Sequence, residues 1–246
     1  MSVQTHLELA VERGASLKFN QPVLRWEPDG EGVRVFTGTD TYSANRLLLS
    51  VGAWLGALLS GPTGSSKSNS NRRFLDLPLS VERQVLLWFE PRSQANQFQP
   101  ENCPIHIWEY APHRFFYGFP DLGDGIKVAV HHEGQLTDPE KIRREVQEDE
   151  IQTMRRLLRR FLPAAEGVLK STMVCMYTNT PDEHFILDYH PTDPQVLVAS
   201  PCSGHGFKFS SVIGELAAAL LCEEKPSFDL SLFRIDRFTG SPAGAK

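Results

Sequence analysis

The pattern of apolar and polar positions begins with a short helix and a first group of strands. Residues 5–13 carry apolar side chains at helical spacing, and the run stops at Gly14, a residue that commonly ends helices. Strand-like runs follow, at 22–26, 32–36 and 41–51. The last of them leads into Gly-Ala-Trp at 52–54, which favours a buried strand that delivers a glycine turn to a ligand crevice. A buried strand with a plain turn is the alternative.

A second group of strands follows residues 61–71, which are rich in Gly and Ser and predict a flexible linker. β-Branched and aromatic residues then predict four strands joined by short loops, and hence a largely antiparallel sheet. These strands are expected at 83–90, 105–110, 114–119 and 125–131.

A polar helix is predicted next. Asp138 and Pro139 are residue types that begin helices, and Pro163 cannot continue one, so the helix is expected from 138 to about 161. Its apolar residues, among them Met154 and Leu158, recur at the spacing of a face that packs on a core.

The chain closes with strands at 170–178 and 184–188 and then a strand, a glycine turn and a helix. The apolar run 196–199 enters a loop with Gly204 and Gly206, and helical periodicity resumes at Val212. Free N–H groups at a helix start attract negative charge, and Lys208 adds a full positive charge there. Because a cation opposes the helix dipole at this end, Lys208 is expected to serve a ligand.

Two other interpretations of this loop stay open from its pattern alone. It can be an ordinary strand-to-helix connection, since glycine permits turns in many settings. It also resembles a hydrolase nucleophile elbow around Ser203, but that motif needs glycine two residues before the serine, where Pro201 stands.

Composition and charge exclude several classes of protein. A formal net charge of −5 leaves no basic surplus to neutralise phosphates, so nucleic acid is not expected as a partner. No apolar run is long enough to cross a bilayer and no signal pattern opens the chain, which predicts a cytoplasmic protein without membrane contact. The four cysteines form no C-x-x-C pair, so neither a disulfide framework nor a metal site is predicted.

Alternation along two strands gathers side chains that can do chemistry. Lys127 and His131 share one face of their strand with the small Ala129 between them, which leaves room for a planar ring above the sheet. A sheet whose solvent face carries Lys and His is the alternative. The same alternation places Cys175 and Tyr177 together on one face of a later strand.

Long contiguous motifs then point to a known family. The strings TNTPDEHFILDYHP, SGHGFKFSSVIGE and KPSFDLSLFRIDRF resemble the C-terminal part of the monomeric sarcosine oxidase and N-methyl-tryptophan oxidase family, flavoproteins that oxidise N-methyl amino acids. The resemblance implies an α/β (α+β) fold that combines an incomplete FAD-binding Rossmann-like domain with a mostly antiparallel-sheet substrate domain. Residues 1–60 and 171–246 would belong to the first domain and residues 61–170 to the second.

The resemblance also implies roles for individual residues. Lys127 would lie over the flavin and promote its reaction with oxygen, and His131, Tyr117 and Tyr177 would line the substrate pocket. Cys175 would be joined to the FAD through its sulfur, with an ordinary buried cysteine as the alternative, and Lys208 would pair with the substrate carboxylate. Residues that would contact the flavin are Gly52, Ala53, Trp54, Ser203, Gly204, His205, Gly206, Phe207 and Lys208.

One expected motif is missing from the sequence. Flavoproteins of this family carry a G-x-G-x-x-G turn for the FAD pyrophosphate, and none occurs in these 246 residues. The sequence thus suggests a fragment or shortened form of an oxidase that takes a small amino acid substrate and oxygen. Two alternatives are a non-catalytic remnant or partner subunit, completed by a chain that supplies the FAD-binding segment, and a hydrolase that uses Ser203 and His205.

Overall fold

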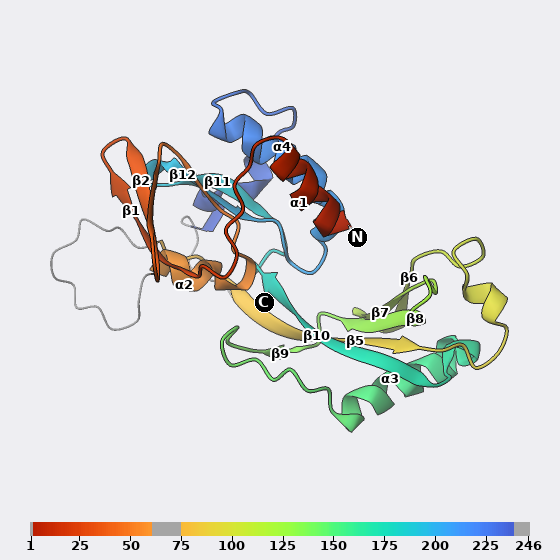
Figure 1. Cartoon of the computed structure of the whole chain (residues 1–246). Coiled ribbons are helices and arrows are strands. Elements are labelled where there is room, and N and C mark those ends of the chain that lie inside the picture. The colour runs from red at the N-terminus through yellow and green to blue at the C-terminus, as the bar shows by residue number, and fades with distance from the viewer. Residues whose placement is uncertain (1, 61–74, 239–246) are drawn as a thin grey trace.

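The computed structural model describes residues 2–60 and 75–238, which form an α/β protein built on three sheets (Figure 1). The predicted linker at 61–71 lies outside the described residues. The largest sheet runs in the order β10-β5-β8-β7-β6, is antiparallel throughout, and gains the short β9 beside β5. The four strands predicted after the linker are therefore confirmed as neighbours in one sheet. Its strands are β5 (Ser80–Phe89), β6 (His106–Ala111), β7 (Arg114–Phe119), β8 (Ile126–His131), β9 (Gln135–Leu136) and β10 (Leu169–Asn179).

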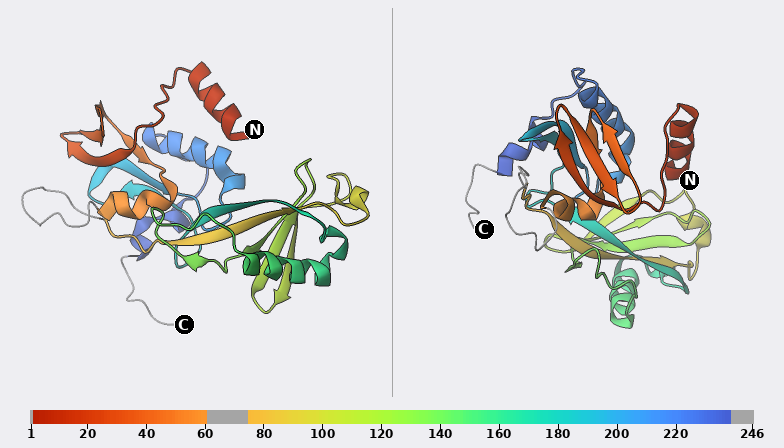
Figure 2. Two further views of the ribbon diagram at one scale, coloured as in Figure 1. Left: turned by 60° about the horizontal axis from the view of Figure 1, so that its bottom comes forward. Right: turned by 60° about the vertical axis from the view of Figure 1, so that its left-hand side comes forward.

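Helix α3 (Glu148–Phe161) covers one face of this sheet. Met154 and Leu158 pack against strand residues that include Phe89, Phe116 and Val128, all almost fully buried. Burial of such side chains stabilises the fold by roughly 1.5–3 kcal/mol each. The opposite face turns toward the part of the molecule that holds α4 and α1 (Figure 2).

The predicted start of the polar helix was wrong. Asp138 forms only a local turn, in which its side chain accepts a hydrogen bond from the Glu140 N–H, and the helix begins ten residues later at Glu148. Gln147 and Glu150 form a reciprocal capping box at that start. The helix cannot begin earlier because the Arg83 guanidinium holds backbone carbonyls of the preceding segment, those of Arg143 and Glu145, each at 2.8 Å.

A smaller sheet of order β11-β12-β4 has apolar residues packed on both of its faces. Strand β12 (Asp193–Ser200) is antiparallel to β11 (Ile186–His190) and parallel to β4 (Leu47–Leu49). Leu197 and Ala199 face helix α4 (Ser210–Leu221), while Val196 and Val198 face the core around Trp26. Burial on both faces explains why β12 is an unbroken apolar run and not an alternating one.

The predicted strand 41–51 is in fact two strands in different sheets. Thr41–Ala44 (β3) is exposed and pairs with β2 (Gly32–Thr37), which also pairs with β1 (Val23–Asp29). Leu47–Leu49 (β4) instead joins β12 in the smaller sheet. The chain changes sheets because the first part is polar and suits an edge, whereas three successive leucines need cover on both sides.

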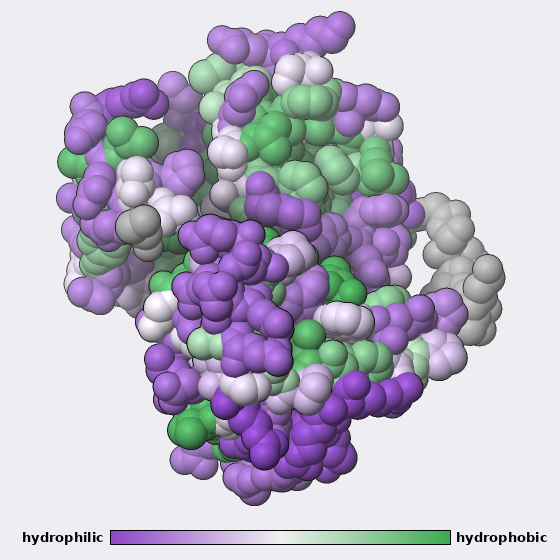
Figure 3. All heavy atoms as spheres, turned by 90° about the vertical axis from the view of Figure 1, so that its right-hand side faces the viewer, coloured by the Kyte–Doolittle hydropathy of each residue, from purple (hydrophilic) through white to green (hydrophobic). Residues whose placement is uncertain are grey.

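The first helix agrees with its prediction but stands apart. Helix α1 spans Ser2–Glu12, and Gly14 follows with φ of 93°, a conformation that suits glycine after a helix. None of the α1 residues is buried, and Val3, Leu9 and Val11 are exposed. Figure 3 shows apolar side chains gathered on the upper half of this side of the molecule, where α1 and α4 lie. Among the helices of residues 2–60 and 75–238, none is both long and apolar enough to cross a membrane.

Candidate active site

Strand register places the predicted site residues on the sheet face that α3 leaves free. Trp88 of β5 pairs with Lys127 on one side and with Ser171 on the other, so residues in step with these two share a face. Tyr117 of β7 joins them because it pairs with Ala129. Five predicted residues from three strands therefore lie on one surface: Tyr117, Lys127, His131, Cys175 and Tyr177.

A tyrosine–histidine cluster occupies one end of this surface. The Tyr177 hydroxyl lies 3.3 Å from Nδ1 of His131, within hydrogen-bonding distance, and the Tyr117 ring lies edge-on to His131 at 5.9 Å between centroids. Burial raises the pKa of both phenols, so both stay protonated near neutral pH. Burial, reinforced by the neighbouring His132, lowers the pKa of His131 to about 4, so this imidazole is neutral. The cluster presents neutral hydrogen-bonding groups.

The depressed pKa of His131 predicts a pH effect on stability. Unfolded chains take up a proton at this histidine below its ordinary pKa of 6.5, whereas the native state resists until about 4. The stabilisation is complete above pH 6.5 and is lost as the pH falls toward 4. Between pH 7 and 4.5 the free energy of unfolding, measured with urea, should therefore fall less in the His131→Gln variant than in wild type. His113→Gln, a change at an exposed turn, should follow wild type, and equal pH slopes for all three proteins would contradict the prediction.

Lys127 and Cys175 occupy the middle of the same surface. The ammonium of Lys127 lies 5.5 Å from the ring centroid of Trp88 and 5.1 Å from that of Phe119, an arrangement that holds a cation by cation–π attraction. Burial raises the pKa of the Cys175 thiol, and the Lys127 charge acts in the opposite direction. Lys127 therefore lies close enough to Cys175 for its positive charge to favour the thiolate form of the sulfur.

The glycine loop closes over Tyr177. Ser203 donates its backbone N–H to the carbonyl of Thr178 at 2.9 Å, which ties the loop to the end of β10. Gly204 adopts φ of 75°, and a Cβ there would lie 2.6 Å from Cε2 of the Tyr177 ring. A Cβ on Gly206 would lie 1.6 Å from the Pro201 carbonyl oxygen. Both glycines are required because the loop approaches the strand and itself too closely for any side chain.

Loop and strand together line a hollow of about 360 Å³. Its walls include Met176, Tyr177, Thr178, Pro201, Cys202, Gly204, His205, Gly206, Phe207 and Ser210. Apolar side chains remain exposed nearby on the sheet face, with Met173 57% and Ile107 66% accessible. A flat ring that lay on this face would cover such side chains.

Several predicted residues take other positions. Lys208 is exposed, donates a hydrogen bond from Nζ to the His205 carbonyl at 2.9 Å and lies 5.0 Å from the Phe209 ring, so it turns back on its own loop. The Gly52–Trp54 turn lies against β10, and Trp54 donates from its indole nitrogen to Glu140. It therefore approaches the strand that carries Cys175.

The hydrolase interpretation finds no support in the described contacts. Ser203 is 1% exposed, and its hydroxyl lies 3.4 Å from the Thr180 hydroxyl and N–H. His205 stacks on Phe185, and its Nε2 lies 3.0 Å from the Glu183 carbonyl oxygen. None of the hydrogen bonds among the described residues joins this serine to this histidine, which a nucleophile and its base require.

The sequence reasoning missed two residues of the site, Glu82 and His132. Glu82 lies opposite Tyr177 in the sheet and is 6% exposed, and its carboxylate lies 3.5 Å from Nδ1 of His132. The predicted strands began after Glu82 and ended before His132, so alternation was not extended to either. The sequence offered one signal for Glu82, namely that a charged residue stands directly before a strand that is otherwise largely apolar.

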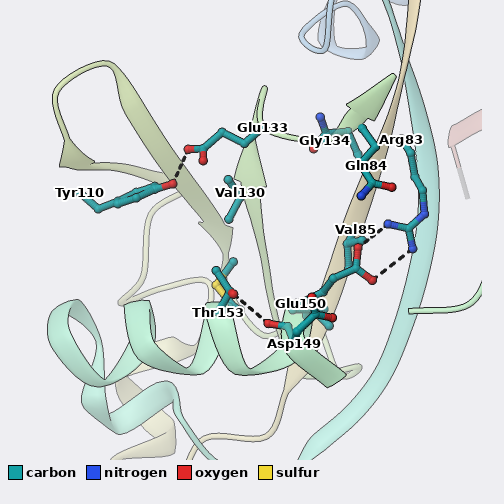
Figure 4. Close-up of a pocket in the computed structure, with 13 residues that line it drawn as sticks. Arg83, Gln84, Val85, Tyr110, Val130, Glu133, Gly134, Asp149, Glu150 and Thr153 are labelled. Atoms are coloured by element: carbon teal, nitrogen blue, oxygen red, sulfur yellow. Dashed lines mark hydrogen bonds and ion pairs between the residues drawn. The ribbon is translucent and has the colours of Figure 1, made fainter. Parts of the chain in front are cut away.

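A second hollow lies on the other face, beside α3 (Figure 4). Most of its charged groups are paired: Arg83 with Glu150, and Glu133 with Tyr110 and Arg114. Two residues of its lining, Gln84 and Gly134, donate hydrogen bonds to Glu82 of the first surface.

Known proteins are similar to this chain over most of its length. Residues 2–220 match the family model described as FAD dependent oxidoreductase. Over 245 residues the chain is 41% identical to monomeric sarcosine oxidase of Streptomyces avermitilis, covering 98% of this chain and 60% of the relative. It is 36% identical to N-methyl-L-tryptophan oxidase of Salmonella arizonae, covering 97% and 60%. These relatives confirm the resemblance drawn from the motifs.

Solved structures support the fold. The open form of NikD, described as an unusual amino acid oxidase essential for nikkomycin biosynthesis, superposes with a TM-score of 0.72 at 23% identity, over 93% of this chain and 57% of that one. Glycine oxidase from Geobacillus kaustophilus gives a TM-score of 0.72 at 20% identity, over 93% and 55%. The chain spans about 60% of the length of the curated relatives it matches. By its match over residues 2–220, the chain belongs to the family of FAD dependent oxidoreductases.

Proposed function

We propose that the chain carries the substrate- and flavin-contacting part of an oxidase of secondary amino acids such as sarcosine. The products would be an imine, which hydrolyses to an aldehyde and an amine, and hydrogen peroxide. The observation that carries the proposal is the convergence of Lys127, Cys175 and Tyr177 on one open face that fits a planar ring. The relatives named above act in the same chemical class by their names.

FAD, when bound, supplies the electron acceptor of this reaction. Cys175 would hold the ring through its sulfur, and Gly52–Trp54 together with the loop 203–207 would lie against it. The pyrophosphate has no G-x-G-x-x-G seat in these 246 residues. That seat must come from a further segment of the same protein or from another chain.

The protein side chains have distinct tasks in this proposal. Protonated Tyr117 and Tyr177 orient the substrate by hydrogen bonding, and neutral His131 holds the Tyr177 hydroxyl at 3.3 Å. Lys127 places a fixed cation where oxygen gains negative charge. To meet the substrate carboxylate, Lys208 would have to break its hydrogen bond to the His205 carbonyl. Because its side chain is exposed, a change of rotamer is open to it.

Replacing Cys175 tests the proposal most directly. Wild-type protein loaded with FAD should keep its yellow colour after acid precipitation, because the flavin is covalently held. Cys175→Ser should release all of it to the supernatant, while Cys103→Ser, a change in the loop before β6, should behave as wild type. Colour that stays with the Cys175→Ser pellet would show another attachment point, and a wild type that never turns yellow would contradict flavin binding by this chain alone.

A second candidate is that the chain acts as one subunit of a composite oxidase. It is favoured by helix α1, whose residues are all unburied and which carries exposed Val3, Leu9 and Val11. Co-purification with a chain that bears G-x-G-x-x-G would support it, and a lone chain that oxidises sarcosine would exclude it.

A further inference from the structure

Next to the tyrosine–histidine cluster lies a buried carboxylate that the proposed function does not use. Glu82 accepts hydrogen bonds from the Gly134 N–H at 2.5 Å, from Gln84 at 2.6 Å and from Asn179 at 2.8 Å. Its second oxygen, the one that Asn179 contacts, also lies 3.5 Å from Nδ1 of His132. Carboxylates are seldom buried without partners, and these contacts hold Glu82 as a fixed anion beside a histidine.

The backbone aims His132 at the loop. His132 has φ of 55°, a left-handed conformation that few residues other than glycine adopt, directly after β8 ends. Its ring lies 4.2 Å from that of His131 and 5.2 Å from that of Tyr177. Its Nε2 points toward Gly204, where an added Cβ would lie 3.1 Å away. Nδ1 therefore faces the carboxylate, and Nε2 faces a residue that lines the hollow.

The proposed reaction requires a proton acceptor. A secondary amino acid carries its nitrogen as an ammonium near neutral pH, and the carbon beside it cannot release hydride until that nitrogen has a lone pair. Lys127 is a cation, and the Tyr117 and Tyr177 phenols are protonated. His131 is a weak base, and its Nδ1 is already engaged by the Tyr177 hydroxyl at 3.3 Å. The remaining groups around His132 are also engaged, His205 with the Glu183 carbonyl and Glu82 with its four neighbours.

We propose that His132, oriented by Glu82, accepts the proton that the substrate ammonium loses before oxidation, an inference that rests on the proposed function. One N–H bond of the ammonium breaks and one forms at Nε2, which leaves a neutral amine and an imidazolium. No electrons change hands in this step. The Glu82 carboxylate balances the new positive charge. The proton later passes to water, because 20% of the His132 side chain is exposed to solvent.

The tautomer of His132 tests the pair without flavin. In the full chain labelled with ¹⁵N at histidine, neutral His132 should carry its proton on Nδ1, and Glu82→Gln should remove that preference. Circular dichroism confirms that the variant folds. A proton on Nε2 in wild type would overturn the proposal, even if the chain binds no flavin and the proposed function fails.

The pH dependence of flavin reduction tests the proton transfer. In flavin-loaded protein mixed anaerobically with sarcosine, His132→Asn should slow reduction about 100-fold at pH 7, in keeping with general-base contributions of roughly 10²–10⁴. The difference in reduction rate between variant and wild type should shrink steadily toward pH 10, where a growing share of sarcosine is already the neutral amine and needs no base. His113→Asn is the matched control, since His113 also has a positive φ, 59°, in an exposed turn. A deficit that is absent, or equal at every pH, would overturn the proposal.

Discussion

Reduced enzyme in which Lys127 is replaced by methionine should react with oxygen about 100-fold more slowly than wild type, or slower still. One-electron transfer to oxygen creates superoxide, and a fixed cation in a site that excludes water stabilises that anion. The charge of Lys127 is free for this task because none of the ion pairs among the described residues includes it, and its neighbours are the Trp88 and Phe119 rings. Methionine keeps most of the length of the side chain and removes the charged ammonium. Deleting one preorganised electrostatic group commonly costs 10²–10³ in rate.

The measurement separates the two halves of the reaction. Stopped-flow mixing of the reduced protein with oxygenated buffer should reveal the loss, whereas anaerobic reduction by sarcosine should change little. Lys170→Met removes an exposed lysine from β10 and should leave both rates unchanged. An oxygen reaction as fast as that of wild type would remove Lys127 from its proposed role.

Replacing Arg83 by methionine should destabilise the folded protein by about 3–5 kcal/mol, the cost of breaking a buried ion pair from one side. Arg83 is 4% exposed and pairs with Glu150 at 2.5 Å while it holds two backbone carbonyls. Glu150 also accepts from the Gln147 N–H at 2.7 Å within the capping box. Removal of the guanidinium leaves two backbone carbonyls without this donor, takes from Glu150 its buried ion-pair partner and loosens the start of α3 (Figure 4).

Unfolding in guanidinium chloride measures the loss. The double variant Arg83→Met/Glu150→Met should recover part of it, because no lone buried charge remains. Arg156→Met, at an exposed position of α3, should cost under about 0.5 kcal/mol, as surface changes usually do. A single variant that unfolds at the wild-type denaturant concentration would show that the pair contributes little.

The errors in the sequence-based predictions have a common physical origin. The start of α3 was placed at Asp138 because local residue types favour a helix there, but Arg83, more than fifty residues earlier, captures the intervening carbonyls. The strand 41–51 was taken as one because apolar and polar parts are contiguous, yet they join different sheets. In both cases a contact between distant segments overrides a local preference.

The sequence by itself determined which side chains share a face, since alternation along a strand depends on local geometry alone: Lys127 with His131, and Cys175 with Tyr177. Its motifs also indicated the family. Only the tertiary structure decided that β8 and β10 present these pairs on the same side of one sheet, through β5 between them. It alone brought Glu82 to His132 and Gly204 to Tyr177. Such contacts depend on how distant segments pack, and no local pattern encodes that choice.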